Sequence, residues 1–279
     1  MGQKDLASKT LESLDDVFSD IINNALFEGE NVIAPEALTD AVLHSQFKTA
    51  KWYHEQERDV AKYWNKCGLR VAFIGVENQT TVSRYMPLRV ISYDGGAYKE
   101  QIPSRHKKKT KQKLLYPVLS LVLYFGTKSK WEKPASLKEV LEIPPELEPF
   151  VNDYKVNVVN VAFLDREVID RFKSDFWFVA DYFWQLRNNK EYKPSKKEIK
   201  NAQEVLQMMS ALTGDNRFER VYNKVEKSGG ERNMCEYLDK IVAKGKLEGI
   251  REGKLEGIRE GKLEGIREGK LEGERKGRD

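Results

Sequence analysis

The run from Leu69 to Gly75 limits the fold more than any other stretch of the sequence. Apart from Arg70 it is apolar, and it is rich in β-branched and aromatic side chains. Such a composition and length are typical of a buried strand. Because side chains alternate along a strand, Glu77 and Gln79, which follow the run, project from the same face. A carboxylate at the end of a buried strand is costly unless an arginine, a metal ion or water meets its charge.

A second predicted strand, over residues 56–64, precedes this run and contains Asp59. The segment 65–68 joins the two strands and contains a glycine, which is typical of a hairpin turn. A hairpin brings Asp59 beside Glu77, and the two carboxylates with the amide of Gln79 form a set of hard oxygen donors suited to Mg²⁺ or Mn²⁺. Because neighbouring carboxylates repel each other, a metal ion explains their pairing better than folding stability does.

These residues resemble the PD-(D/E)XK nucleases, whose signature is an Asp on one strand and Glu-x-Lys on the next. Later motifs resemble one branch of that superfamily, the recombination-promoting, transposase-like nucleases, in which Gln commonly stands in for Lys. The matching segments, spread over residues 10–240, are Asp16-Val17-Phe18, Met86-Pro87-Leu88-Arg89, Tyr93-Asp94, Pro117-Val118 and Leu121 to Gly126, followed by Trp131.

The resemblance implies an α/β fold of the restriction-endonuclease-like type, with a mixed central sheet flanked by helices. It also implies a metal-dependent DNA endonuclease, linked to recombination or transposition, in which Asp59 and Glu77 hold Mg²⁺ or Mn²⁺ together with Asp16. Gln79 would orient the attacking water without supplying the positive charge of a lysine, and Arg89 would contact the DNA backbone. From the sequence alone, Asp16 is better explained as a solvated acid on the helix predicted over residues 5–27.

The densest basic run of the chain, residues 104–113, is the predicted DNA-binding segment. A solvated loop and a phosphate-contacting loop explain it equally well. An apolar stretch over 114–125 follows and predicts a strand covered on both faces, with Pro117 at its start. The candidate DNA contacts in the basic run are Arg105, Lys107, Lys108, Lys109 and Lys111.

The remaining patterns predict further elements around the sheet. A helix with proline in its first turn is expected over residues 82–101. The aromatic residues between 177 and 184 are better explained as a buried helix face than as a platform for stacked bases. The other predicted elements are a strand over 154–164 and helices over 165–188, 195–213, 217–227 and 231–244.

From Lys246 the chain repeats the octapeptide Lys-Leu-Glu-Gly-Ile-Arg-Glu-Gly three times. Glycine at every fourth position costs about 1 kcal/mol each in a helix relative to alanine, and a period of four does not match the helical turn. The repeat therefore predicts a low-complexity tail outside the catalytic core. We expect a nuclease core over 1–135, an extension of the same domain by a strand and helices over 136–245, and the tail over 246–279.

Composition limits the class of protein but leaves its function open. The chain has 279 residues, 33% of them charged, and its net charge of +4 is too small to establish a polyanionic partner. No apolar run is long enough to span a bilayer and no signal peptide is recognisable, so we expect a cytoplasmic protein without a membrane partner. Two alternatives stay open: a catalytically inactive DNA-binding or scaffold protein that forms homo-oligomers through its tail, and an RNA-directed nuclease.

Neutralising four lysines of the basic run together is expected to weaken DNA binding and to reduce its dependence on salt. For every phosphate that the protein no longer neutralises, the slope of log affinity against log salt should fall by roughly 0.9. Fluorescence anisotropy with a labelled duplex at several salt concentrations measures this slope, and neutralising four lysines of the tail is the control. An unchanged slope would indicate that the basic run is a solvated loop that does not contact DNA. The substituted residues are Lys107, Lys108, Lys109 and Lys111.

Overall fold

The computed structural model describes the chain between residues 11 and 218, with gaps. The basic run, the repeat tail and, except for Phe218, the helices predicted over 217–227 and 231–244 lie outside the described residues. The described residues are 11–41, 44–48, 53–57, 59–102, 114–188, 192–193, 195, 197–215 and 218.

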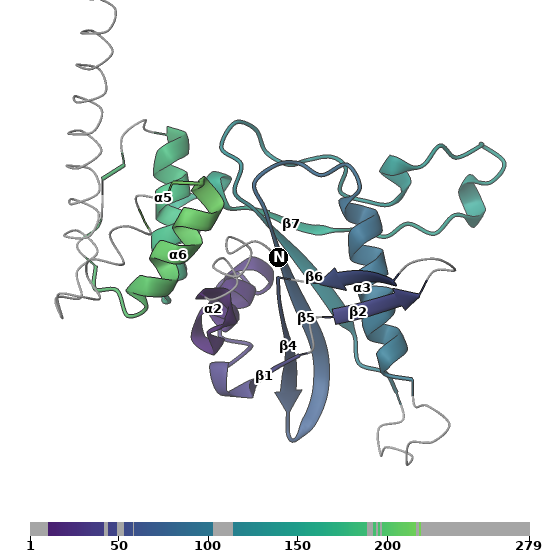
Figure 1. Ribbon diagram of the computed structural model, residues 1–279, viewed down its shortest axis with the longest axis horizontal. Coiled ribbons are helices and arrows are strands. Elements are labelled where there is room, and N and C mark those ends of the chain that lie inside the picture. The colour runs from purple at the N-terminus through teal and green to yellow at the C-terminus, as the bar shows by residue number, and fades with distance from the viewer. Residues whose placement is uncertain are drawn as a thin grey trace, which may run out of the picture.

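A mixed sheet of five strands forms the centre of the fold (Figure 1). Its members are β1 (Leu38–Asp40), β4 (Val60–Lys66), β5 (Leu69–Gln79), β6 (Val118–Tyr124) and β7 (Asn157–Asn160). Their spatial order is β1-β4-β5-β6-β7, with β4 antiparallel to β1 and β5, and with β6 parallel to β5 and β7. The α/β class with a mixed sheet, which the sequence predicts, is therefore confirmed.

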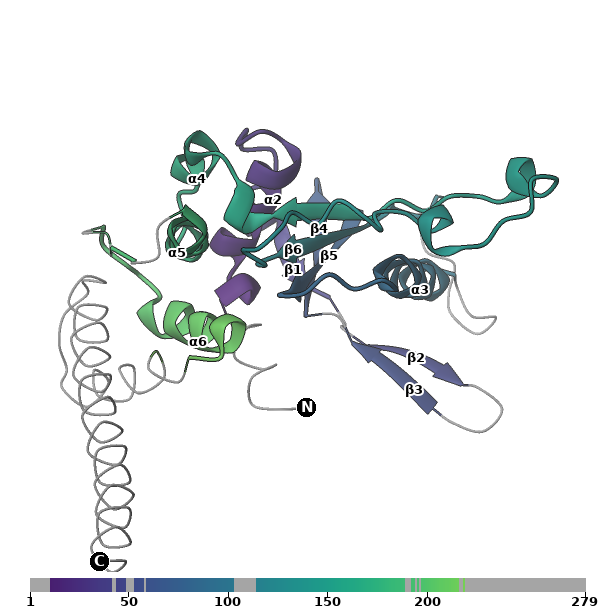
Figure 2. The same ribbon diagram turned by 90° about the horizontal axis from the view of Figure 1, so that it is seen from above.

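The predicted hairpin is formed by β4 and β5, which are joined by Cys67 and Gly68. Both turn residues have positive φ, +51° and +75°, as tight hairpin turns of the primed types require. The prediction of a single strand over 56–64 is wrong, because a bend at Asp59 separates two strands. The earlier one, β3 (Tyr53–Glu57), pairs with β2 (His44–Lys48) in a small second sheet beside α3 (Figure 2).

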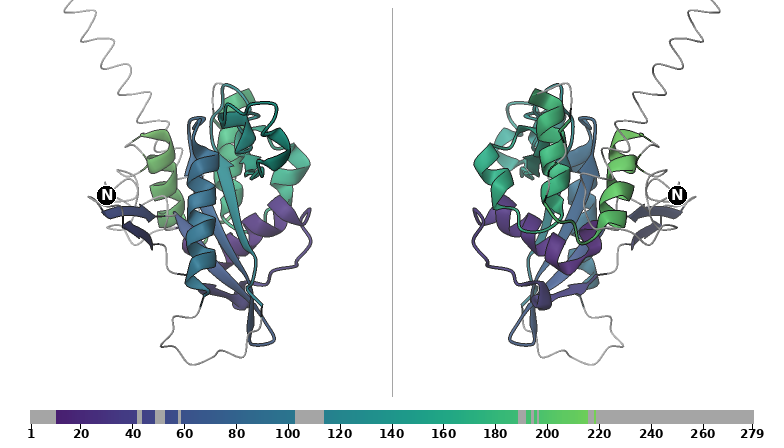
Figure 3. Two further views of the ribbon diagram at one scale, coloured as in Figure 1. Left: turned by 90° about the vertical axis from the view of Figure 1, so that its right-hand side faces the viewer. Right: turned by 90° about the vertical axis from the view of Figure 1, so that its left-hand side faces the viewer.

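Helices pack on both faces of the sheet (Figure 3). The large core that includes α2, α4, α5 and α6 uses one face of β5, whereas α3 packs in two smaller cores on the other face. The helices are α2 (Asp15–Leu26), α3 (Met86–Glu100), α4 (Arg166–Arg171), α5 (Phe176–Asn188) and α6 (Ala202–Thr213), with short 3₁₀ turns at η1 (Pro35–Ala37), η2 (Lys138–Val140), η3 (Glu148–Phe150) and η4 (Val161–Phe163). No helix in the described part of the chain combines the length and apolarity needed to cross a membrane.

Alternation along the central strands separates the two cores. Ile74 and Val76 of β5 lie in the large core, while Phe73 packs toward α3 with Ala97. The strand β6 is covered on both faces, as predicted, and begins directly after Pro117. The position of a residue in β5 therefore decides which layer of helices its side chain meets.

Several predicted boundaries are wrong because tertiary contacts override local pattern. The helix predicted over 5–27 is broken at Leu14, which has an extended ψ of 130°. The helix predicted over 165–188 divides into α4 and α5, because the Asp20 carboxylate accepts the backbone N–H groups of Lys173 at 2.8 Å and Ser174 at 2.7 Å. The strand predicted over 154–164 and the helix predicted over 195–213 are shortened to β7 and α6.

The same substitution at two glycines should change stability in opposite directions. Gly68→Ala forces an L-residue to keep φ near +75° and should destabilise the protein by about 1 kcal/mol. Gly95→Ala lies in α3 with no atom within 4 Å of the added methyl group, so it should stabilise by about 0.5–1 kcal/mol. Urea denaturation measures both free energies of unfolding. Equal effects would contradict the turn geometry.

Candidate active site

Two acidic side chains meet where β4 begins and β5 nears its end. Val60 pairs with Val76 across the two strands, so Asp59, the residue before Val60, lies at the Glu77–Asn78 end of β5. The structure thus places the two predicted acids together, as a hairpin requires. Gln79 lies on the same face of β5 as Glu77 and is partly exposed.

Asn78 connects Asp59 to a third acid, Glu12. The backbone N–H of Asn78 donates to Asp59 Oδ2 at 2.7 Å, and its side-chain Nδ2 donates to Glu12 Oε2 at 2.6 Å. Glu12 is fully buried in the helical turn that precedes Leu14. The end of β5 therefore gathers acids from three separate segments of the chain.

Glu12 holds its proton at neutral pH. Burial is the largest cause that raises its pKa from 4.5 to about 8. The hydrogen bond from Asn78 lowers the pKa, while the nearby charges of Asp59 and Glu77 raise it further. Its second oxygen, Oε1, has no hydrogen-bond partner among the described residues. Glu12 is thus a buried acid that would ionise more easily if a cation came near.

Arg89 of α3 supplies the positive charge of the cluster. Its Nη2 donates to Glu77 Oε2 at 3.0 Å and to the Tyr93 hydroxyl at 3.2 Å. Burial by itself lowers the pKa of Arg89, but Glu77 and Tyr93 raise it more, so the net shift is upward. Its side chain is still 39% exposed, whereas that of Glu77 is only 2% exposed. Arg89, predicted as a DNA contact, is therefore first of all the partner of a buried carboxylate.

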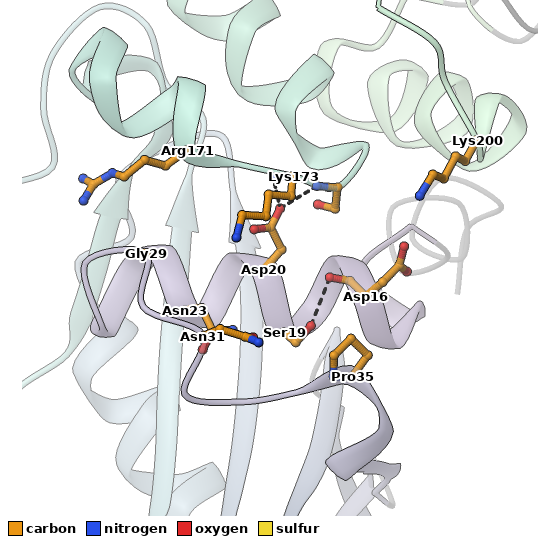
Figure 4. A pocket seen from close by; sticks show the side chains of 11 residues that line it. Asp16, Ser19, Asp20, Asn23, Gly29, Asn31, Pro35, Arg171, Lys173 and Lys200 are labelled. Atoms are coloured by element: carbon orange, nitrogen blue, oxygen red, sulfur yellow. Dashed lines mark hydrogen bonds between the residues drawn. The ribbon is translucent and has the colours of Figure 1, made fainter.

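Asp16, predicted as a third metal ligand, lies elsewhere. It lines a cavity of about 220 Å³ together with Asp20, Lys173 and Lys200 (Figure 4). The reason is the break at Leu14: an unbroken helix would place residues 12 and 16 on one face, but the extended residue separates their directions. Glu12, not Asp16, is the acid from the first helical segment that joins the cluster.

The predicted DNA contacts of the basic run form no part of this geometry. All of them lie outside the residues that the structure describes: Arg105, Lys107, Lys108, Lys109 and Lys111.

The donor set suits a hard divalent cation. Glu12, Asp59 and Glu77 offer carboxylate oxygens, and Asn78 offers an amide oxygen, Oδ1, that accepts no hydrogen bond from the described residues. Oxygen-only donors of this kind match Mg²⁺ or Mn²⁺. Within the described ranges, however, no three acidic, histidine or cysteine side chains have the spacing of a formed metal site. The residues fit the ion in chemistry, and Arg89 now neutralises Glu77.

The sequence patterns missed Glu12 and Asn78. Asn78 was visible only as the unspecified middle residue of the Glu-x-Gln motif. Glu12 stands one helical turn before Asp16, so an acid was available there, but the sequence gives no sign of the break that selects it. Comparisons with protein-family models, curated proteins and solved structures each give no match.

Folding stability should fall as pH rises between about 5 and 8. Over this range the folded protein keeps the proton of Glu12, while the unfolded chain, with a pKa of 4.5, has released it. The unfolded state therefore binds fewer protons, and this group lowers the free energy of unfolding by roughly 1.4 kcal/mol per pH unit. Glu12→Gln keeps an oxygen for Asn78 and should remove that part of the slope.

Urea denaturation across this pH range measures the difference between wild type and variant. Glu146→Gln, which changes an exposed acid, is the control and should keep the wild-type slope. If wild type and Glu12→Gln had the same slope, Glu12 would ionise in the folded protein as freely as in the unfolded chain.

Proposed function

We propose that the protein is a metal-dependent DNA endonuclease with a restriction-endonuclease-like fold, acting in recombination or transposition in the cytoplasm. The observation that carries this proposal is the proximity of Asp59 and Glu77 at the end of β5, where Asn78 also binds the buried acid Glu12. The charges of Asp59 and Glu77 raise the pKa of Glu12, and like charges at this spacing repel one another. A divalent cation would offset this repulsion. The resemblance of the Asp59 and Glu77-x-Gln79 pattern to PD-(D/E)XK nucleases indicates that the reaction is phosphodiester hydrolysis.

In this proposal Asp59 and Glu77 would hold Mg²⁺ or Mn²⁺, and Glu12 would be the additional acid that was expected of Asp16. When bound, the ion polarises the scissile phosphate and lowers the pKa of the attacking water. Glu12 would ionise more easily beside such an ion, because the cation would offset both its burial and its acidic neighbours. Gln79, on the same strand face as Glu77, orients the water.

Arg89 has two successive roles. Before a cation binds, it neutralises Glu77. Once Glu77 has another positive partner, the guanidinium becomes available to a phosphate, whose oxygens match its fork of N–H donors. Because the Arg89 side chain is 39% exposed, it can turn toward a ligand in solvent. This reconciles its observed ion pair with the predicted DNA contact.

A second candidate is a catalytically inactive DNA-binding or scaffold protein. The ion pair between Arg89 and Glu77 favours it, since it stabilises the acids without any metal. In that case Glu12, Asp59 and Asn78 form a structural polar network. The two candidates differ in their response to Mg²⁺, and an RNA substrate tested in parallel separates a DNA nuclease from an RNA-directed one.

Asp59→Asn should abolish Mg²⁺-dependent cleavage of plasmid DNA. The variant should also lose the rise in melting temperature that Mg²⁺ gives the wild type, a gain of about 2.7 kcal/mol at a hundredfold excess over Kd. Its stability without metal should not fall, since the Asn oxygen still accepts from the backbone of Asn78 and one negative charge is gone. Gel electrophoresis and thermal denaturation measure the two effects.

Asp165→Asn is the matched control, because Asp165 is exposed and makes no side-chain cap to α4. It should behave as wild type in both assays. Cleavage by Asp59→Asn at the wild-type rate would rule out the proposed site. Wild-type protein that binds DNA but neither cleaves it nor responds to Mg²⁺ would favour the second candidate.

A further inference from the structure

A cavity of about 570 Å³ is lined in part by Thr80 and Thr81, which directly follow β5. It is bounded by residues 80–82 after β5, by residues 124–129 at the end of β6, and by α5 and α6. Its volume is typical of small-ligand sites. It also lies at the carboxyl ends of two parallel strands, where α/β sheets commonly bind ligands.

The walls of this cavity combine aromatic rings with hydroxyl groups. Of the aromatic residues that line it, Tyr182 is partly exposed, whereas Phe125 and Phe183 are buried, at 2% and 4% exposure. Hydroxyls come from Thr80, Thr81, Thr127 and Ser129. At its edge lie two apolar side chains that are unusually exposed, Val82 at 42% and Leu186 at 39%. Such a lining suits a flat ring with polar edges better than a purely aliphatic ligand.

The cavity lining carries one charged group of each sign, Lys128 and Asp215. Lys128 is exposed on the loop after β6 and takes part in none of the ion pairs found among the described residues. An ammonium group beside an aromatic wall can hold a phosphate while a ring lies against the wall. The ring of Tyr182 and the ammonium group of Lys128 therefore match the two parts of a nucleotide.

The aromatic wall is fixed before any ligand binds. The rings of Phe125 and Phe183 lie 5.1 Å apart, and those of Tyr182 and Phe183 lie 5.3 Å apart. The loop is equally constrained at Gly126, where an added Cβ would lie 2.0 Å from the Tyr124 hydroxyl. The cavity is thus part of the packed fold, and binding needs little reorganisation of these rings.

We propose that this cavity binds an unpaired nucleotide of the DNA substrate, with its base against Tyr182 and its phosphate at Lys128. The inference rests on the proposed function and names its substrate class. Thr80 lies three residues beyond Glu77, about 10 Å along an extended chain at 3.3 Å per residue, so the nucleotide held here flanks the bond that is cut. DNA with an unpaired base is therefore the preferred substrate over a continuous duplex.

Binding measured without metal tests this preference apart from cleavage. Two DNAs are compared by anisotropy in EDTA, a duplex and the same duplex with one extrahelical 2-aminopurine. Wild type should bind the bulged DNA about tenfold more tightly, as expected for one base stacked on aromatic side chains, and 2-aminopurine fluorescence should change on binding. Leu186→Glu places a negative charge at the cavity and should bring the affinity ratio close to one.

Leu147→Glu is the matched control, since it adds the same charge at another exposed leucine, far along the chain between β6 and β7. It should weaken the binding of both DNAs equally and leave the ratio of their affinities unchanged. An equal affinity of wild type for the two DNAs, or an unchanged ratio in Leu186→Glu, overturns the inference. The inference is also overturned if wild type binds an apolar dye in the cavity, Leu186→Glu does not bind the dye, and wild type shows no preference for bulged DNA.

The result separates this inference from the proposed function. Plasmid cleavage with Mg²⁺ but no preference for bulged DNA removes only the nucleotide site. A preference abolished by Leu186→Glu, in a protein that never cleaves DNA, keeps the nucleotide site and removes the nuclease.

Discussion

The repulsion among three acids at one end of β5 is the constraint that the surrounding structure satisfies. Each acid is stabilised in a different way. Glu12 keeps its proton, Glu77 pairs with Arg89, and Asp59 accepts the backbone N–H of Asn78. These three interactions require that a helical segment, a hairpin and α3 all contact the end of β5. In the proposed function, a divalent cation would replace both the proton of Glu12 and the ion pair of Glu77 with Arg89.

The sequence predicted the part of this site that depends on local pairing. Asp59 and Glu77 belong to one hairpin, so the alternation of β5 and a two-residue turn suffice to bring them together. Glu12 reaches Asn78 across 66 residues, and its direction depends on one extended residue, Leu14. Periodicity describes an ideal helix and gives no sign of such a break, and the family resemblance indicates Asp16 instead of Glu12.

The acids of the first helix show the same limit from another side. Asp15 pairs with Lys62, a lysine buried to 2% exposure that also contacts Asp40 at 2.6 Å. Asp20 instead holds the chain that leads into α5. Neighbouring acids on one helix therefore stabilise a buried cation and fix a turn, and composition alone assigns them no separate roles.

The two-sided burial of β5 makes its length matter more than the identity of most of its side chains. Odd-numbered residues such as Phe73 and Glu77 face α3, and even-numbered ones such as Ile74 and Val76 face the large core. Loss of a single codon between Gly68 and Glu77 would exchange these faces and drive a carboxylate into the apolar layer. Along this strand, substitutions can be tolerated at many positions, but an insertion or deletion of one residue would disrupt the fold and the site together.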